Sequence, residues 1–474
     1  MTANVSSNYS STLTLIMRGV SMKIKLLGTA LALAVAAAPI AATAGGVSGG
    51  NANSDWTIYG WQNWSYEWVS SQTTSLEPSG ERTRDFSRID NNAANIGFAA
   101  SIDTGMSMMG ESVKANFQCE MFTFHNRFNG SGFSGYNDFC NRNSKISLSG
   151  AFGEFMLGQW LLPYNEMVAQ WVDPFYDAGA DSHTSIMGSV GYGTRFFNGG
   201  FGFDGGPFGF GPALNQGFNR RQNGLVQYFS PNISGFTFRL ATTNAQQDAG
   251  AQYFAGNGEV EVIDSNGAVQ DLDPRIWSTG VAYENTLSSG DNVWFAVTYQ
   301  KHDEWAAVDY ACSDSDDDSY RIAGRYIHQW GNGMFTRVSA MWESLEYDWE
   351  DCAGGTLLSA NTALTTNTTN LELERDAWMV SGIHNFGNGF DFRFSYMDGD
   401  EFDCDTCDVT DSDTDGTAYN LGIFYTMPAG TELRLTYSDI DNEDNANYDY
   451  GINPAATRVG GDTDMIAVGI VQWF

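Results

Sequence analysis

The chain has 474 residues and a formal net charge of −34, because 57 aspartates and glutamates outweigh 23 lysines and arginines. Binding to nucleic acids or to anionic lipid needs clustered lysine and arginine, so this balance excludes both as the main function. The chain also holds 53 glycines, 31 phenylalanines, 21 tyrosines and 14 tryptophans. Such a composition is typical of strands, tight turns and interfacial aromatic side chains.

The N-terminal region has the form of an export signal. Lys23 and Lys25 precede an apolar run that ends near Ile40, and small residues follow up to Ala44. We predict a secretory signal peptide at 22–44. Residues 1–21 fit no targeting pattern and are interpreted as an upstream extension outside the fold.

The exported part is predicted to consist of a short leader at 45–55 and one folded region at 56–474. No stretch within it has the roughly 18 apolar residues of a transmembrane helix. An exported chain of this kind is either soluble or a β-barrel, because only helices and closed barrels satisfy their backbone groups in lipid.

Segments of about ten residues alternate apolar and polar side chains, as a strand with one lipid-facing side requires. Phe390, Phe392 and Tyr396, for example, interleave with Asp391 and Arg393. Sixteen such segments begin near Trp56, Arg88, Ser112, Arg142, Glu154, Arg220, Ser234, Trp277, Asn292, Ser319, Met334, Asp376, Phe390, Gly416, Thr431 and Asp464. An even number is typical of a closed single-chain barrel.

The connections between these segments alternate between short turns and long loops. The short turns include Phe152-Gly153, Gly331-Asn332-Gly333, Gly387-Asn388-Gly389 and Pro428-Ala429-Gly430. Short periplasmic turns and long extracellular loops are the asymmetry of an outer-membrane barrel. The alternative is a soluble all-β protein, which also has alternating strands and turn residues.

The last segment ends with the chain, because Ile466, Val468 and Ile470 share the parity of the terminal Phe474. A final strand of this kind closes on the first strand and removes the free edges that lipid does not tolerate. We therefore predict an all-β fold, a sixteen-stranded antiparallel transmembrane barrel.

Several short motifs occur in an order that is specific in combination. They are T-I-Y-G at 57–60, N-I-G-F at 95–98, K-A-N-F-Q-C-E at 114–120, L-S-G-A-F-G at 148–153, L-G-Q-W at 157–160, D-P-F at 173–175 and the run 223–235. Over essentially its whole mature length the chain resembles the general bacterial porins of Gram-negative outer membranes. The resemblance implies a homotrimer, a long third loop folded into the lumen, passive diffusion of small hydrophilic solutes, and assembly through Phe474.

The longest insert, from Leu161 to Asn219, corresponds by this resemblance to the constriction loop. Its acidic candidates are Glu166, Asp173, Asp177 and Asp181. The opposite wall is expected to supply Lys114, Arg142, Arg220 and Arg221, with further arginines at 239, 325, 393 and 434. An ordinary solvated loop is the alternative for the acids, and a lumen-wall position without a special role is the alternative for each arginine.

The basic wall is thinner than in the family. Trp61, Asn95 and Gln159 stand where the family commonly has arginine. Fewer positive charges beside an acidic loop predict a pore that prefers cations. Arg142 and Lys145 have opposite parity, so only one of them is expected to face the lumen unless the strand is bulged.

The six cysteines fall into three neighbouring pairs, and disulfides persist outside the cytosol. The candidates are Cys119 with Cys140, Cys312 with Cys352, and Cys404 with Cys407. The sequence does not choose among the other pairings that six cysteines allow. We favour structural disulfides that link loops over a redox role for Cys404 and Cys407.

Metal and enzyme signals are weak. Asp411, Asp413 and Asp415 follow the first half of a calcium-binding EF-hand loop, yet Gly422 stands at its twelfth position. The favoured interpretation is that the acidic loops bind divalent ions diffusely and that these ions bridge to lipopolysaccharide. Matches to nucleophile-elbow and dinucleotide patterns at 46–50 and 200–205 lack the helix that either requires.

The sequence thus predicts an outer-membrane porin without catalytic activity or cofactor. A substrate-specific channel in the same fold is one alternative. A structural or adhesive barrel with a plugged lumen is another. Solute preference, exclusion limit and the path of the glycine- and phenylalanine-rich tract at 196–218 do not follow from the sequence.

Overall fold

The computed structural model describes residues 47–51, 53–74, 81–92, 94–123, 139–176, 182–188, 218–219, 221–244, 260–263, 269–272, 275–305, 314–350, 356–357, 364–365, 371–403, 413–428, 430–446, 448–451, 455 and 460–474. The predicted upstream extension and signal peptide lie outside these residues. No helix within the described part of the chain is long and apolar enough to cross a membrane. The helices there are α2 (Pro163–Glu166), α3 (Ala169–Val172) and the 3-10 turn η2 (His183–Ser185).

Nearly all other regular structure is β-strand. The strands are β1 (Val47–Asn51), β2 (Ser54–Thr74), β3 (Glu81–Asn91), β4 (Asn95–Met108), β5 (Glu111–Phe122), β6 (Ser144–Gly150), β7 (Gly153–Leu161), β8 (Arg221–Phe229), β9 (Phe236–Asn244), β10 (Val260–Ile263), β11 (Val269–Leu272), β12 (Arg275–Thr286), β13 (Asn292–Trp305), β14 (Asp314–Gly331), β15 (Met334–Glu350), β16 (Thr356–Leu357), β17 (Leu364–Thr365), β18 (Leu371–Phe386), β19 (Phe390–Gly399), β20 (Gly416–Thr426), β21 (Thr431–Asn442) and β22 (Thr463–Trp473).

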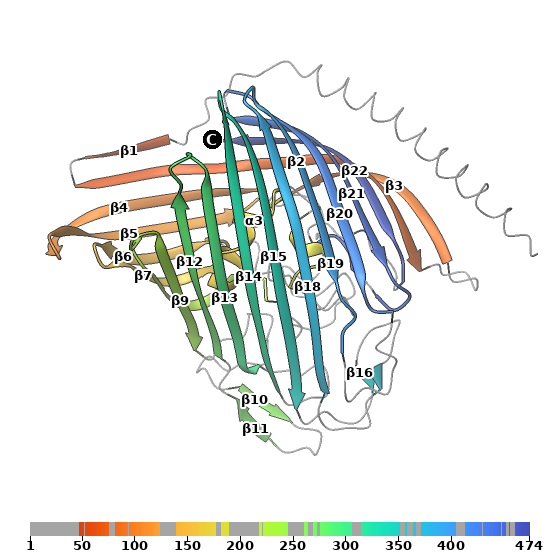
Figure 1. Cartoon of the computed structure of the whole chain (residues 1–474). Helices are drawn as coiled ribbons and strands as arrows, with labels where there is room; N and C mark the ends of the chain where they lie inside the picture. Colours follow the sequence, from red (N-terminus) through yellow and green to blue (C-terminus); the bar gives the residue numbers. More distant parts are fainter. Residues whose placement is uncertain are drawn as a thin grey trace, which may run out of the picture.

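One 18-stranded sheet forms the wall (Figure 1). Strands β3 and β4 pair with successive parts of β2 and together make one barrel strand, interrupted near Asn92. Strand β1 only flanks the start of β2. The barrel therefore has sixteen antiparallel strands, as the alternation predicts. The hairpins β10–β11 and β16–β17 lie in long connections outside the wall.

The barrel closes between its last and first strands. Strand β22 pairs with β2 from Trp61 opposite Trp473 to Ser71 opposite Thr463. The backbone of Phe474 continues this ladder through two hydrogen bonds with Gly60, each 3.0 Å. Strand β1 pairs with β2 just beyond this point, so part of the predicted leader belongs to the sheet. The closure confirms that the chain end joins the first strand and leaves no free edge there.

Short connections alternate with long ones around the barrel. Strand β14 passes to β15 through Asn332 and Gly333, and Gly331, Asn332 and Gly333 all have positive φ. Glycine and asparagine tolerate this left-handed backbone at low cost, which explains their use in so tight a turn. The predicted short turns at 152–153 and 387–389 likewise join neighbouring strands, and only a short connection separates β20 from β21.

The strand faces follow the predicted alternation on the outside of the barrel. Phe390, Phe392 and Tyr396 are exposed there, whereas Asp391 and Ser395 of the same strand are buried on the inside. The inside is less uniform than predicted, because many inward positions between β12 and β22 carry apolar side chains. These positions lie beneath segments of the chain that enter the barrel.

Candidate functional site

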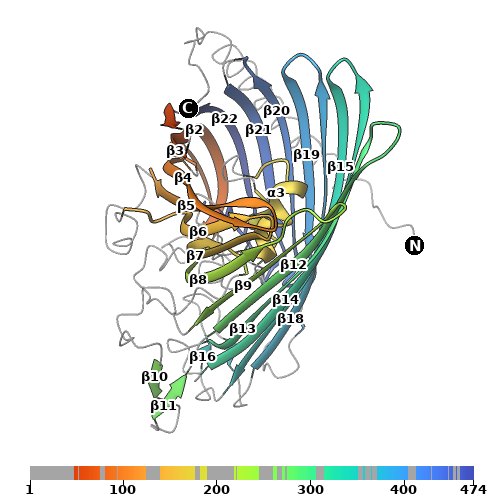
Figure 2. The ribbon, with the colours of Figure 1, turned by 90° about the vertical axis from the view of Figure 1, so that its left-hand side faces the viewer.

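The third loop, residues 162–220 between β7 and β8, enters the barrel. Figure 2 shows α3 between the wall of β3–β7 and the wall of β15–β19. Helix α2 contacts β9, β12 and β13, and α3 contacts β14 and β15. The predicted insertion of the third loop is therefore seen for its described residues, 162–176, 182–188 and 218–219.

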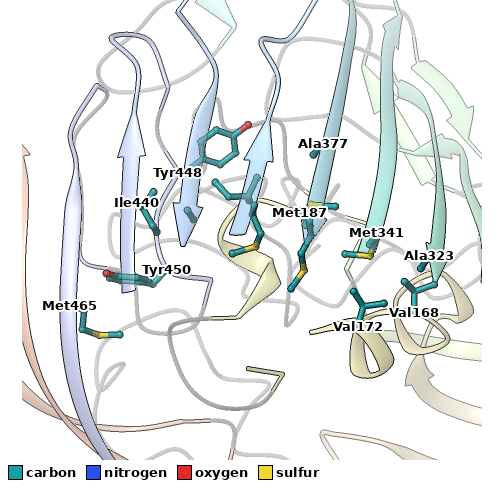
Figure 3. Packing of buried hydrophobic residues seen from close by; sticks show 14 of the residues in the cluster. Val168, Val172, Met187, Ala323, Met341, Ala377, Ile440, Tyr448, Tyr450 and Met465 are labelled. Carbon is teal, nitrogen blue, oxygen red and sulfur yellow. The ribbon is translucent and has the colours of Figure 1, made fainter. Parts of the chain in front are cut away.

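Apolar side chains attach this loop to one side of the barrel. Val168, Val172 and Met187 are buried in the same cluster as Ala323 and Met341 of the wall (Figure 3). Tyr448 and Tyr450, which precede β22, join the cluster near Ile440 and Met465 (Figure 3). Burial of apolar area stabilises contacts of this kind, by roughly 25 cal/mol per Å². The loop is thus packed against the wall as a domain core is packed.

A buried ion cluster reinforces the attachment. The carboxylate of Glu343 on β15 lies 2.7 Å from Arg321 Nη2 on β14 and 2.9 Å from Arg375 Nη2 on β18. The same carboxylate accepts the backbone N–H of Gly188 at 2.6 Å and the hydroxyl of Tyr164 at 3.1 Å. All three charged side chains are fully buried. Glu343 therefore joins three wall strands to two points of the third loop.

The two arginines extend this cluster to further parts of the chain. Arg321 donates to Asn165 and Asn219 of the third loop, at 3.2 and 2.7 Å. Arg375 donates to the backbone oxygen of Ile186 at 3.1 Å and to the hydroxyl of Tyr448 at 2.7 Å. Sharing one carboxylate between two buried arginines leaves one formal positive charge, which these neutral acceptors help to solvate.

Of the predicted loop acids, Glu166 and Asp173 are described, and both have partners inside the protein. Glu166 pairs with Arg239 and accepts the indole N–H of Trp160 at 3.1 Å. Asp173 is buried and accepts the backbone N–H groups of Phe175 and His183, each at 2.8 Å. These contacts shape the loop. The predicted acids Asp177 and Asp181 lie outside the described residues.

Of the predicted basic wall residues, Arg142 and Arg221 are buried and have partners. Arg142 pairs with Glu120 and lies over the ring of Trp61, 4.9 Å from its centroid. Arg221 donates to Asn143 at 2.6 Å. Lys114 is exposed on β5. Arg220 lies outside the described residues.

Arg142 and Lys145 do not lie in one regular strand, so their opposite parity does not place them on opposite faces. Strand β6 begins at Ser144, so Arg142 precedes the regular alternation and still reaches Glu120. Lys145 pairs with Glu154 and lies 4.7 Å from the Trp160 ring centroid. Both side chains therefore reach inward acids. Asn95, at one of the positions where the family commonly has arginine, is fully buried.

Further inward arginines lie around the wall that carries the loop. Arg325 lies 3.0 Å from Glu284, and Arg393 lies 3.0 Å from Asp391 and 3.1 Å from Glu432. Arg434 donates to Asn63 across the β21, β22 and β2 ladders. Arg337 donates to the backbone oxygen of Val172 at 3.4 Å. The guanidinium groups of Arg325 and Arg393 are thus bound to carboxylates.

One disulfide is described, between Cys119 on β5 and Cys140, with 4.7 Å between the Cα atoms. It ties the segment before β6, which carries Arg142, to the neighbouring strand. The remaining four cysteines lie outside the described residues.

The metal candidates remain weak. Asp411 lies outside the described residues, and the backbone N–H of Asp413 donates to Glu401 at 3.0 Å. One group of three carboxylates within the described part of the chain, Glu346, Glu372 and Glu374, is close enough to share an ion. Glu346 and Glu374 alternate with the inward residues Leu345 and Arg375, so this group lies on the outer face of the barrel.

Sequence reasoning missed the Glu343 cluster. A signal was present, because Arg321 and Glu343 share the parity of the small or apolar residues Ala323 and Met341. Charged and apolar side chains on one inward face indicate a wall that another segment covers.

Comparison with known proteins identifies the family. A family model described as Gram-negative porin matches residues 29–472. The structure is similar to an anion-selective porin from Comamonas acidovorans, with 17% identity over 89% of this chain and 100% of that chain and a TM-score of 0.57. It is also similar to OmpT of Vibrio cholerae, with 13% identity over 90% of this chain and 100% of that chain and a TM-score of 0.50. A search of curated proteins found no match. The chain belongs to the Gram-negative porin family and is a multi-pass β-barrel of the outer membrane.

Proposed function

We propose that this porin is a homotrimeric, water-filled channel through which small hydrophilic solutes and ions diffuse passively, with a preference for cations. The family supports a channel rather than an enzyme. The third loop, packed inside the barrel, supports a constriction that limits solute size. The single observation that carries the cation preference is the contrast between arginines inside the barrel that lie in ion pairs and described acids at its mouth that pair with no lysine or arginine.

Inside the barrel several arginines lie beside carboxylates. Arg239 is bound to Glu166, Arg325 to Glu284, and Arg142 to Glu120. An ion pair presents little net field to a passing solute at distances longer than its own length. The arginine-rich wall therefore does not make the constriction strongly attractive to anions.

At the end that carries the long connections the acids crowd one another. The neighbouring carboxylate of Asp415 raises the pKa of Glu443, and burial together with Glu401 raises the pKa of Asp415. Within the described part of the chain no lysine or arginine forms an ion pair with either residue. Uncompensated carboxylates at a channel mouth concentrate cations and lower the local concentration of anions.

The trimer and the membrane partners follow from the family resemblance. Phe474, paired with Gly60 at the barrel seam, is the proposed recognition point for the outer-membrane assembly machinery. The acidic outer loops are proposed to contact lipopolysaccharide through divalent ions. A trimer that resists unheated detergent electrophoresis and dissociates on heating is expected.

The function is tested with purified protein in planar lipid bilayers. Unit conductance, insertion in steps of three, and the reversal potential under a potassium chloride gradient are read in one experiment. A reversal potential of the sign set by potassium supports the proposal, and one of the sign set by chloride contradicts the cation preference. Conductance that saturates with one solute would favour the substrate-specific alternative, and absence of conductance would favour a plugged barrel.

A further inference from the structure

A cavity of about 230 Å³ lies between the third loop and the wall, beside the short connection from β8 to β9. The loop contributes Met167 and Trp171, and the wall contributes Phe229, Arg239, Glu284 and Trp294. Ser230, Asn232 and Thr237 add small polar groups to its lining. Aromatic rings thus line one part of the cavity, and hydrogen-bonding groups line the rest.

The aromatic part is a platform of two indoles. The ring centroids of Trp171 and Trp294 are 6.1 Å apart, with 31° between their planes. Trp171 is 37% exposed, although neighbouring residues of the loop such as Val168 and Val172 are fully buried. A large apolar side chain that stays exposed on a helix whose Ala169 and Val172 are buried is available for a ligand.

The charges around the platform cancel. Arg325 lies 4.8 Å from the Trp171 ring centroid, and its guanidinium is bound to Glu284. Arg239 lies 4.7 Å from the Phe229 ring centroid and is bound to Glu166. One guanidinium group lies over one face of Trp171 and another lies over Phe229, so an organic cation would meet like charge beside the exposed part of Trp171. Each guanidinium also has its own carboxylate, so an anion finds no free positive partner.

A neutral ligand rich in hydroxyl groups satisfies both parts of the cavity. The C–H groups of a pyranose ring carry partial positive charge and stack on the negative face of an indole. Its hydroxyl groups donate to carboxylates and accept from guanidinium, amide and hydroxyl groups, which Glu284, Arg239, Asn232 and Ser230 provide. The size of the cavity suits one sugar ring with its neighbour left in the channel.

We propose that this cavity is a binding subsite for one pyranose ring of a neutral oligosaccharide, with Trp171 as its stacking platform. The subsite deepens the proposed diffusion function, since it rests on solutes reaching the inside of the barrel. It lies on the side of the third loop that faces the short connections, so a sugar that has passed the constriction is held there briefly.

The test uses cellobiose as the neutral probe. In a planar bilayer, cellobiose is expected to reduce the ion current in a saturable manner. Trp171→Ala is expected to raise the half-saturating concentration about tenfold, near the upper contribution of an aromatic stacking contact. Trp277→Ala is the matched control, because Trp277 is 43% exposed on the outer face of β12. Its half-saturating concentration should equal that of the unaltered protein.

Calorimetric titration of the trimer in a detergent without a sugar headgroup separates this inference from the proposed function. Binding of cellobiose that Trp171→Ala weakens supports the subsite even if no conductance is found. No saturable binding by unaltered protein that conducts normally would overturn the subsite and leave the channel function intact. Tighter, Trp171-dependent binding of tetraethylammonium or benzoate than of cellobiose would overturn the assignment of a neutral sugar.

Discussion

The wall from β12 to β22 and the wall from β2 to β8 share one pattern of alternation, yet their inward side chains differ in kind. The first wall has small apolar residues at many inward positions, among them Ala282, Ala296, Ala323, Ala377 and Ala418. The second wall has inward ion pairs, among them Arg88 with Glu67, Arg142 with Glu120, and Lys145 with Glu154. The third loop and the segment before β22 pack on the first wall.

The difference shows that an inward position of a barrel is polar only where water or a polar partner reaches it. Beneath a packed loop the inward position becomes part of a core, and small residues leave room for the loop backbone. Gly280 is an example, because a Cβ there would lie 2.7 Å from Met167 Sδ and from Thr298 Cγ2. Glu343, which remains charged under the loop, is bound by two arginines.

The largest difference in stability between the walls is expected when one glutamate of an ion pair is neutralised by substitution in each wall. Glu343→Gln leaves Arg321 and Arg375 buried without a carboxylate, and losing one partner of a buried ion pair costs about 3–5 kcal/mol. Glu154→Gln removes the partner of Lys145 in a partly exposed pair, which costs about 0–1 kcal/mol. Urea unfolding in lipid vesicles, followed by tryptophan fluorescence, measures both values.

Ion-current noise in planar bilayers is a second measurement on the same two variants, and it reports how firmly the third loop is held. Glu343→Gln should increase current fluctuations because the third loop is less firmly held, and Glu154→Gln should not. Equal losses of stability in the two variants would show that the loop is held by apolar packing alone.

The second effect concerns the wall from β2 to β8. There the disulfide between Cys119 and Cys140 holds a connecting segment to the wall. The bridge closes a segment with a sequence separation of 21 residues. Removing a bridge of this kind lowers stability by about 2–4 kcal/mol in chain-entropy accounts. Cys119→Ser with Cys140→Ser is expected to lower the free energy of unfolding by this amount and to loosen Arg142. The idea fails if reduced and oxidised protein unfold at the same urea concentration.

A third effect compares Gly280, which faces the inside of the barrel, with Gly324, which faces the outside. Gly280→Ala places a methyl group against the third loop and is expected to cost about 1–3 kcal/mol, as overpacking does. Gly324→Ala is the matched control, because the nearest atom to a Cβ there is 3.9 Å away. Its effect should stay within about 0.5 kcal/mol. Similar unfolding curves for the two variants would indicate that Met167 moves aside freely.

The smallest effect is expected at the short connection between β12 and β13, in the wall on which the third loop packs. Asp291 accepts hydrogen bonds from the backbone of Gln329 and from Tyr326 and Ser289, which lower its pKa from 3.8 to about 2. A depressed carboxyl pKa contributes stability above about pH 4 that is lost as the pH falls toward 2. Asp291→Asn should flatten the dependence of stability on pH in this window. An unchanged pH profile between 2 and 4 would contradict the assignment.

Most of the architecture follows from local sequence patterns. Alternation with a period of two marks each strand, and runs such as Gly331-Asn332-Gly333 mark where the chain reverses. Antiparallel neighbours joined by such turns have few other ways to pair, so strand number, closure at Phe474 and the position of the third loop were all accessible. The strand β1 was missed, because Gly49 and Gly50 have low strand propensity and pair only through the edge that β2 offers.

The interior was decided by the tertiary structure. Glu166 and Asp173 are recognisable as acids of the third loop, but only the fold shows that Arg239 and backbone N–H groups bind them. Glu343 meets Tyr164 across a sequence separation of 179 residues, and no local pattern encodes such a contact. Strand periodicity assigns a side chain to a face of the sheet, because the backbone geometry is repetitive. What that side chain touches depends on where an irregular loop settles inside the barrel, and this is set by the sum of many distant contacts.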